Sequence, residues 1–183
     1  VLACSDMALA TRLQEEFSDF HLRFYAGSDL IGVELAGALK NTVAIAAGII
    51  DGLGLGANTQ AALMTRGLHE NTRLGVAFGA EPDTFRGLAG MGDLVLTCTG
   101  GLSRNRQVGQ RLGRGETLDQ ILGSMREVAE GVRTTPAAAK LATQLGVEMP
   151  ITQSMAMILG GEIEPKDALK ELMTRQLKVE TQL

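Results

Sequence analysis

A lysine in the middle of a long apolar segment is the first candidate for chemistry in this 183-residue chain. Lys40 lies within residues 29–51, where the only other charge between the two terminal aspartates is that of Glu34. The residues three and four positions from Lys40 are Ala36, Gly37, Val43 and Ala44. If the segment is helical, the ammonium group lies on a stripe of small side chains. Such a lysine either reaches water along its apolar neighbours or works as a proton donor or acceptor.

The second candidate is a polar cluster at a predicted helix start. Gly100 and Gly101 lead to Ser103, a favoured N-cap residue, and Arg104 and Asn105 occupy the first turn that follows. A helix N-terminus offers free N–H groups and a partial positive charge. A guanidinium and a carboxamide beside it suit a phosphate. The alternative is a solvated basic helix face, and the anion site is the favoured interpretation.

Three further features carry weaker signals. Asp93 follows a Gly-x-Gly pair, and such an aspartate is usually a turn or cap residue. The Gly-x-Gly-x-Gly of residues 52–56 follows a predicted helix rather than a strand, so it predicts a tight turn between helices and not a dinucleotide fingerprint. His69 has no companion ligands at metal spacing, so no metal site is predicted.

Composition narrows the class of protein. The net charge of -4 argues against a dedicated nucleic-acid binder, and 3% aromatic residues with no Trp leave no stacking platform for bases. The 23 glycines indicate close helix packing or close ligand approach. Cys4 and Cys98 lack metal spacing and fit a reducing cytoplasm. Residues 29–51 are expected to be too short and too often interrupted by polar residues to span a membrane.

The chain divides near residue 28. Residues 1–4 and 22–26 read as strands, and Leu9, Leu13 and Phe17 between them repeat at helical spacing. This is a β-α-β pattern, too small for a stable sheet on its own. We therefore expect residues 1–28 to be the remnant of an N-terminal dinucleotide-binding domain, and residues 29–183 to form an all-helical domain.

Helical patterns dominate that second part. Asn58 is expected to cap a helix, and Pro136 to mark the start or a kink of an alanine-rich helix that ends at Gly146. Residues 147–151 are expected to be extended. The other predicted helices begin near residues 82, 103, 117, 152 and 165.

Five stretches together resemble the bacterial NAD(P)-dependent glycerol-3-phosphate dehydrogenases. They are DLIGVELAGALKN, GLGLGANTQAALMTRGLHE, GLAGMGDLVLTCTGGLSRNR, EVAEGVRT and LGVEMPIT. They follow the family order over nearly all of residues 29–152. The resemblance implies a Rossmann-like domain followed by a helical substrate domain of the 6-phosphogluconate-dehydrogenase-like type, with this chain as the second domain and the end of the first.

The resemblance also implies roles for particular residues. Lys40 exchanges a proton with the substrate C2 oxygen, Asp93 and Thr97 line the same pocket, and Asn41 orients the lysine. The residues that hold substrate include Ser103, Arg104 and Asn105, and Arg104 is able to reach phosphate groups of substrate or cofactor. The residues that contact the nicotinamide cofactor are Arg104, Val128 and Glu130.

The implied reaction is the reduction of dihydroxyacetone phosphate to sn-glycerol 3-phosphate with NADH or NADPH, for glycerophospholipid synthesis. The implied partners are the phosphate substrate and the N-terminal Rossmann-like domain, and a homodimer stays open. Since no dinucleotide fingerprint follows a strand here, we expect this chain alone to be inactive. The alternatives are a related hydroxyacid dehydrogenase and a non-catalytic helical module that binds through the basic run 104–114.

Overall fold

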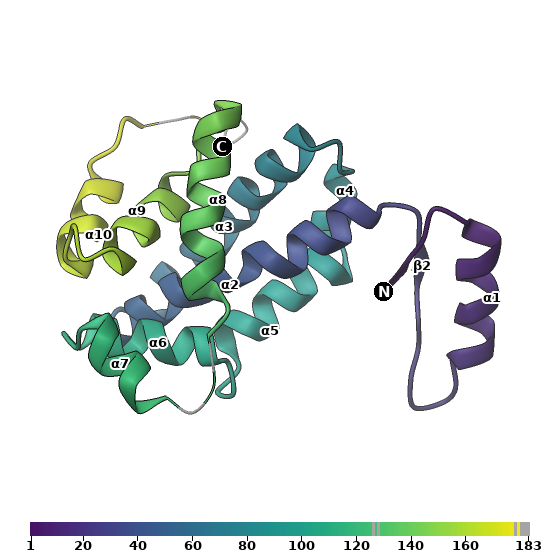
Figure 1. Ribbon diagram of the computed structural model, residues 1–183, viewed down its shortest axis with the longest axis horizontal. Coiled ribbons are helices and arrows are strands. Elements are labelled where there is room, and N and C mark those ends of the chain that lie inside the picture. Colours follow the sequence, from purple (N-terminus) through teal and green to yellow (C-terminus); the bar gives the residue numbers. More distant parts are fainter. Residues whose placement is uncertain (126, 128, 178, 180–183) are drawn as a thin grey trace.

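A bundle of helices and a small β-α-β unit make up the molecule (Figure 1). The computed structural model describes residues 1–125, 127, 129–177 and 179. The strands are β1 (Leu2–Ala3) and β2 (Ala26–Gly27). The helices are α1 (Met7–Phe17), α2 (Leu30–Gly52), α3 (Ala57–Ala77), α4 (Pro82–Arg86), η1 (Leu88–Gly92), α5 (Asp93–Thr99), α6 (Arg104–Gly113), α7 (Leu118–Ser124), α8 (Gly131–Leu145), α9 (Pro150–Leu159) and α10 (Pro165–Met173).

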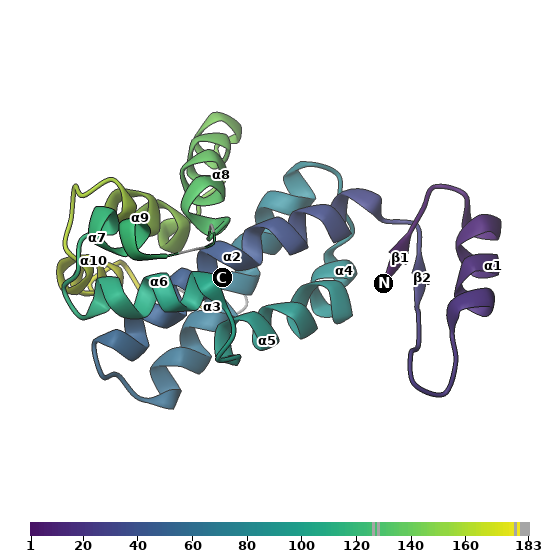
Figure 2. The same cartoon turned by 60° about the horizontal axis from the view of Figure 1, so that its bottom comes forward.

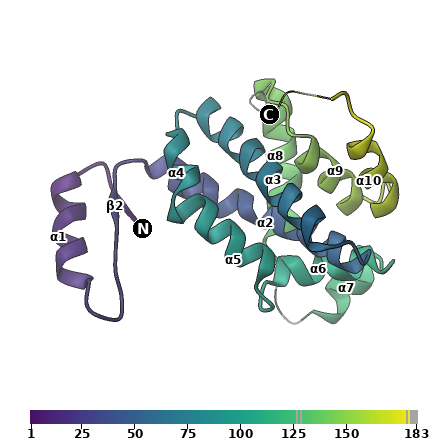
Figure 3. The ribbon, with the colours of Figure 1, turned by 180° about the vertical axis from the view of Figure 1, so that it is seen from behind.

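The β-α-β unit lies apart from the bundle, at the N-terminal end of α2 (Figure 3). β1 and β2 are parallel, with Leu2 opposite Ala26. Asp6 caps α1 by accepting a hydrogen bond from the Leu9 N–H. The predicted β-α-β pattern is confirmed, but the strand expected at residues 22–26 pairs only at Ala26–Gly27.

Helix α2 runs through the middle of the bundle, with α3, α5, α6 and α8 packed around it (Figures 1 and 2). Asp29 caps its first turn. By length and composition alone, the 23 residues of α2 are long and apolar enough to cross a membrane. The expectation that the segment is too short and too often interrupted by polar residues is therefore wrong. However, 67% of its most apolar 18-residue window is buried inside the fold. Its apolar surface is therefore core surface of the bundle.

Helices α2 and α6 cross at glycines. A Cβ atom on Gly109 would lie 1.9 Å from the carbonyl oxygen of Ile45, and one on Gly48 would lie 2.0 Å from that of Arg106. No side chain fits at either position, so the two backbones touch. This contact explains part of the high glycine content, as the composition suggested.

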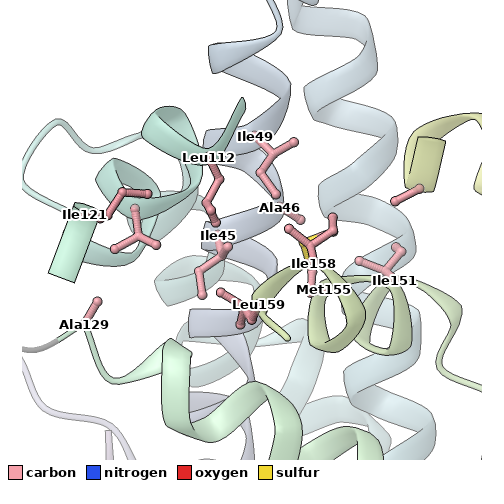
Figure 4. Close-up of a cluster of buried hydrophobic side chains, with 12 residues drawn as sticks. Ile45, Ala46, Ile49, Leu112, Ile121, Ala129, Ile151, Met155, Ile158 and Leu159 are labelled. Atoms are coloured by element: carbon pink, nitrogen blue, oxygen red, sulfur yellow. The ribbon is translucent and has the colours of Figure 1, made fainter. Parts of the chain in front are cut away.

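The largest apolar cluster fills the space between α2, α6, α7 and α9 (Figure 4). Figure 4 labels Ile45, Ala46, Ile49, Leu112, Ile121, Ala129, Ile151, Met155, Ile158 and Leu159. In a second cluster the ring of Phe85 lies against Gly75, where a Cβ would lie 2.2 Å from it. Side chains of α2 are therefore packed against neighbouring helices in both clusters.

Three predicted boundaries are wrong. α8 begins at Gly131, so Pro136 lies inside it, on an exposed position near the N-terminal end where one lost backbone hydrogen bond disturbs the helix little. Residues 147–151 are not all extended, because α9 already begins at Pro150, a residue preorganised for a first turn. α3 begins one residue before Asn58, with Gly56 at its N-cap.

Candidate active site

Lys40 and Asp93 meet at the junction of α2 and α5. The Lys40 Nζ donates to the Asp93 Oδ2 at 2.5 Å, across 53 residues of sequence. Their side chains are 23% and 34% exposed, so a small molecule has access to the pair. Asp93 is the first residue of α5, directly after η1, and its N–H is bonded to carbonyl oxygens of Leu88 and Gly90 in η1. The structure therefore supplies a proton-donating ammonium with a carboxylate fixed beside it.

Thr97 lies one turn beyond Asp93 on α5. Its hydroxyl oxygen is 2.6 Å from the Asp93 carbonyl oxygen, to which it donates, and 3.2 Å from the Asp93 Oδ1. One carboxylate oxygen thus faces Lys40 and the other faces Thr97. The family resemblance assigned Asp93 and Thr97 to the same pocket as Lys40. The structure joins Asp93 to Lys40 and Thr97 to Asp93. The sequence pattern by itself suggested only a turn or cap residue at position 93.

Asn41 and Asn105 form a buried bridge between three helices. The Asn105 Nδ2 donates to the Asn41 Oδ1, and the Gly131 N–H donates to the Asn105 Oδ1, both at 2.9 Å. The two asparagines are only 6% and 8% exposed. Because both ends of the Asn105 amide are engaged, α2, α6 and the first turn of α8 are held together beside Lys40.

The start of α6 has the capping expected from the sequence. The Ser103 Oγ accepts from the Arg106 N–H at 3.3 Å. The Arg104 Nη1 lies 2.9 Å from the Glu127 Oε2, an exposed pair that was not expected. Exposed ion pairs are weak, about 0–1 kcal/mol, so a phosphate dianion can take the place of the Glu127 carboxylate. Positions 104 and 105 also lie in the first turn, where backbone N–H groups have no intrahelical acceptor.

The basic run 104–114 is not a continuous cationic face. Arg106 is paired with Asp51, and Arg111 with Glu116. The hydrogen bonds to Arg111 hold the pKa of the Glu116 carboxyl below its ordinary value. Neutralised side chains do not give the phosphate affinity of a nucleic-acid surface, which weakens the binding-module alternative.

The residues expected near the cofactor are only partly visible. Glu130 is exposed and lies at the N-cap of α8, directly before Gly131. Val128 lies outside the described residues. His69 is exposed on α3. Within residues 1–125, 127, 129–177 and 179, no group of three or more His, Cys, Asp or Glu could hold a metal ion.

The described cavities lie away from Lys40. One of about 630 Å³ lies between α9 and α10 and is lined by residues such as Met157 and Glu171. Another of about 250 Å³ lies where β2, α2 and α4 meet and is lined by Gly27, Asp29 and Thr84 among others. Neither lining includes Lys40 or Asp93, whose side chains are 23% and 34% exposed.

Comparison with known proteins gives this arrangement a family. A sequence model described as the C-terminus of NAD-dependent glycerol-3-phosphate dehydrogenase matches residues 29–170. The chain belongs to this family. The resemblance indicated by the sequence motifs is thereby confirmed, and so is the expected mainly helical fold.

Two bacterial relatives illustrate the similarity of this chain to curated proteins. A glycerol-3-phosphate dehydrogenase (NAD(P)+) from Citrifermentans bemidjiense is 62% identical over 97% of this chain and 53% of its own length. One from Geobacter sulfurreducens is 57% identical over 98% and 54%. The chain therefore spans about half the length of the curated relatives it matches.

Solved structures agree with this assignment. The crystal structure of glycerol-3-phosphate dehydrogenase from Coxiella burnetii superposes with a TM-score of 0.89 at 43% identity, covering 94% of this chain and 53% of that one. The Plasmodium falciparum enzyme, at 19% identity and a TM-score of 0.86, supports the fold alone.

Proposed function

We propose that this chain is the substrate-binding half of an NAD(P)-dependent glycerol-3-phosphate dehydrogenase, which interconverts dihydroxyacetone phosphate and sn-glycerol 3-phosphate. The observation that carries the proposal is the accessible Lys40–Asp93 pair at 2.5 Å within the family-matched helices. In this proposal residues 1–28 are the end of the nucleotide-binding domain and residues 29–183 are the substrate domain. The enzyme works in the cytoplasm and feeds glycerophospholipid synthesis.

The proposed chemistry assigns one task to each side chain. The reduced nicotinamide, when bound, supplies the hydride that reaches C2 of the ketone. Lys40 donates the proton that the C2 oxygen takes up, and the Asp93 carboxylate holds the ammonium in place and stabilises its charge. The Thr97 hydroxyl lies 3.2 Å from the other oxygen of that carboxylate and borders it on the side away from Lys40. In the oxidative direction the same lysine, as a neutral amine, takes the proton back.

The substrate phosphate is assigned to the start of α6. Arg104 offers a planar fork of donors, and the first-turn N–H groups add the positive end of the helix dipole. The Asn41–Asn105 hydrogen bond supports this assignment, because it joins the residue after Lys40 to the first turn of α6. A hydroxyacid without phosphate has no use for this clamp, which favours the phosphate ester over the hydroxyacid alternative.

The chain fits only one end of a dinucleotide. Arg104 and Glu130 are the described residues that the family resemblance assigns to the cofactor, whereas the glycines of residues 52–56 join α2 to α3 and so make no strand-to-helix phosphate loop. The remaining cofactor contacts are assigned to the preceding half that the longer relatives carry. We call the protein that includes both halves the full-length protein.

Lys40→Ala in the full-length protein tests the proposal. We expect the reduction of dihydroxyacetone phosphate to slow by about 10²–10⁴-fold, as is typical for loss of a general acid. NADH affinity, measured by fluorescence titration, should stay unchanged. Lys140→Ala is the matched control, because Lys140 is exposed on α8 and has no assigned role. Turnover near the wild-type rate in Lys40→Ala would contradict the proposal. A wild-type protein that does not reduce dihydroxyacetone phosphate would contradict it as well.

A further inference from the structure

The helical turn before Asp93 is wider than an α-helical turn. The Gly92 N–H donates to the Gly87 carbonyl oxygen at 3.2 Å. The Asp93 N–H donates to the Leu88 carbonyl oxygen. Each of these bonds spans five residues, whereas a bond of an α-helix spans four. Wide turns of this kind are rare and often lie at functional sites, and this one ends at the proposed acid pair.

Gly90 holds the wide turn against α4. A Cβ on Gly90 would lie 2.1 Å from the carbonyl oxygen of Phe85 and 2.4 Å from its Cα. Only glycine therefore lets the two backbones touch. Phe85 is itself fully buried, and its ring lies against Gly75 of α3. The middle of η1 is thus fixed to the core through α4.

Buried side chains hold the rotation of α5 after the turn. Leu94 and Cys98 lie one turn apart and are 1% and 0% exposed, in the apolar cluster that α5 shares with α2. Successive residues of an α-helix differ by about 100° around its axis. Asp93 therefore lies on the face next to this buried one, and there it meets Lys40.

The wide turn connects these two fixed parts in the required orientation. From Leu88 to Asp93, five residues close one hydrogen-bonded turn. In a regular α-helix of the same residues, Asp93 would be turned by about 100° relative to Leu88, which is the rotation of one residue. With Gly90 fixed against α4, the carboxylate would then leave the ammonium group of Lys40.

We propose that Gly90 is a positioning residue for the proposed reaction, an inference that rests on the proposed function. Its contact with Phe85 keeps η1 in the wide turn, and this turn aims the Asp93 carboxylate at the ammonium group. Gly90 touches neither substrate nor cofactor and acts only through Asp93. A methyl group at position 90 pushes η1 away from α4, releases the wide turn and separates the carboxylate from Lys40.

The test compares Gly90→Ala with Gly92→Ala in the full-length protein. Gly92 is nearer to Asp93 in sequence, but its Cβ would meet nothing closer than the Leu88 Cδ2 at 3.6 Å, so it is a matched control. We expect Gly90→Ala to lower kcat for dihydroxyacetone phosphate roughly tenfold or more, with NADH affinity unchanged. Gly92→Ala should keep the wild-type kcat. Equal losses in the two variants, or no loss in Gly90→Ala, would overturn the proposal.

Asp93→Asn separates positioning from a general loss of structure. Because Gly90 acts through the Asp93 carboxylate, Gly90→Ala should change kcat by less than about twofold in protein that already carries Asp93→Asn. A general loss of structure would instead multiply the two effects on kcat. Full multiplication would therefore show that Gly90 acts independently of Asp93.

Phe85→Leu is the second variant, and it covers the case in which Gly90→Ala does not fold. The smaller side chain leaves space beside Gly75 and lets the α4 backbone move without a clash. We expect kcat to fall roughly threefold or more, again with NADH affinity unchanged. A wild-type kcat in this variant would show that the contact with α4 does not aim the carboxylate.

Crystal structures test the positioning without any turnover. The distance from the Lys40 Nζ to the Asp93 Oδ2 is 2.5 Å in the wild type. It should stay near this value in Gly92→Ala and exceed about 4 Å in Gly90→Ala. An intact ion pair in Gly90→Ala would contradict the proposal. A wild-type protein that shows this pair but does not reduce dihydroxyacetone phosphate would contradict only the proposed reaction.

Discussion

Replacing Glu70 tests how the bundle holds its C-terminal helices. This carboxylate is only 2% exposed and lies on α3. It accepts from the Ile151 N–H at 2.7 Å and from the N–H and hydroxyl of Thr152 at 3.0 and 3.1 Å. The N-cap residue of α9, Met149, makes no side-chain cap hydrogen bond. Glu70 is therefore the cap of α9, supplied by a different helix.

The expected cost follows from the donors left behind. Glu70→Ala leaves two backbone N–H groups unpaired at buried positions, and each unsatisfied donor costs about 1–3 kcal/mol. Water that enters the space recovers part of this, so we expect the free energy of unfolding to fall by roughly 3 kcal/mol. Glu70→Gln keeps one acceptor oxygen and should lose roughly half as much. Glu171→Ala, at an exposed position on α10, should stay within about 0.5 kcal/mol.

Urea unfolding of the full-length protein, followed by far-UV circular dichroism, measures these differences. A loss below about 1 kcal/mol for Glu70→Ala would refute the cap, since two unpaired buried donors cost more than that. Equal losses for the Ala and Gln variants would show that the acceptor oxygens do not matter.

The pH dependence gives an independent check. Burial raises the pKa of the Glu70 carboxyl, against the lowering effect of its hydrogen bonds and of the Arg73 charge. A raised pKa means that the folded state takes up this proton first as the pH falls. The wild type should therefore gain unfolding free energy relative to Glu70→Gln as the pH falls through the raised pKa toward 4.5. A wild-type advantage that shrinks over this range would mean that the hydrogen bonds outweigh burial.

Three more outcomes are expected. Arg104→Lys should weaken the apparent affinity for dihydroxyacetone phosphate roughly tenfold and hardly affect unphosphorylated dihydroxyacetone, because a lysine cannot form the planar fork; equal losses in kcat/KM on the two substrates would remove the phosphate role. Gly109→Ala should lower both Tm and kcat, since its Cβ would lie 1.9 Å from a backbone oxygen; an unchanged protein would mean that α2 and α6 separate freely. Burial raises the pKa of the Cys98 thiol to about 12, so iodoacetamide at pH 8 should label the partly exposed Cys4 and spare Cys98, as mass spectrometry of native protein would show.

Local signals in the sequence predicted the parts of the fold that depend on neighbouring residues. Ser103 caps the helix that follows it, as predicted, and the helix expected near residue 117 begins at Leu118, with Thr117 as its N-cap. These predictions succeed because a cap is a contact over three residues. Gly146 ends α8 in the left-handed conformation for the same local reason.

The site itself depends on contacts between distant residues. The sequence offered Lys40 as a candidate on spacing, but its partner Asp93 is 53 residues away and was assigned to the same pocket only through the family resemblance. The Arg104–Glu127 pair and the Glu70 cap had no sequence signal at all. No periodicity reports which side chains meet once helices cross, because that depends on the crossing geometry.

That geometry is itself determined by glycines, which links packing to the proposed reaction. Asn41 on α2 is hydrogen-bonded to Asn105 on α6, and Ile45 on α2 contacts Gly109 on α6. In both contacts the α6 residue lies 64 positions later in the sequence. The two helices therefore run parallel in a single register, with the proposed acid on α2 and the phosphate clamp at the start of α6. A methyl group at the crossing would push the backbones apart by roughly 1 Å or more, and a misplacement of that size can cost about 10²-fold in rate. The relative position of Lys40 and Arg104 thus depends on a contact about one and a half turns further along each helix.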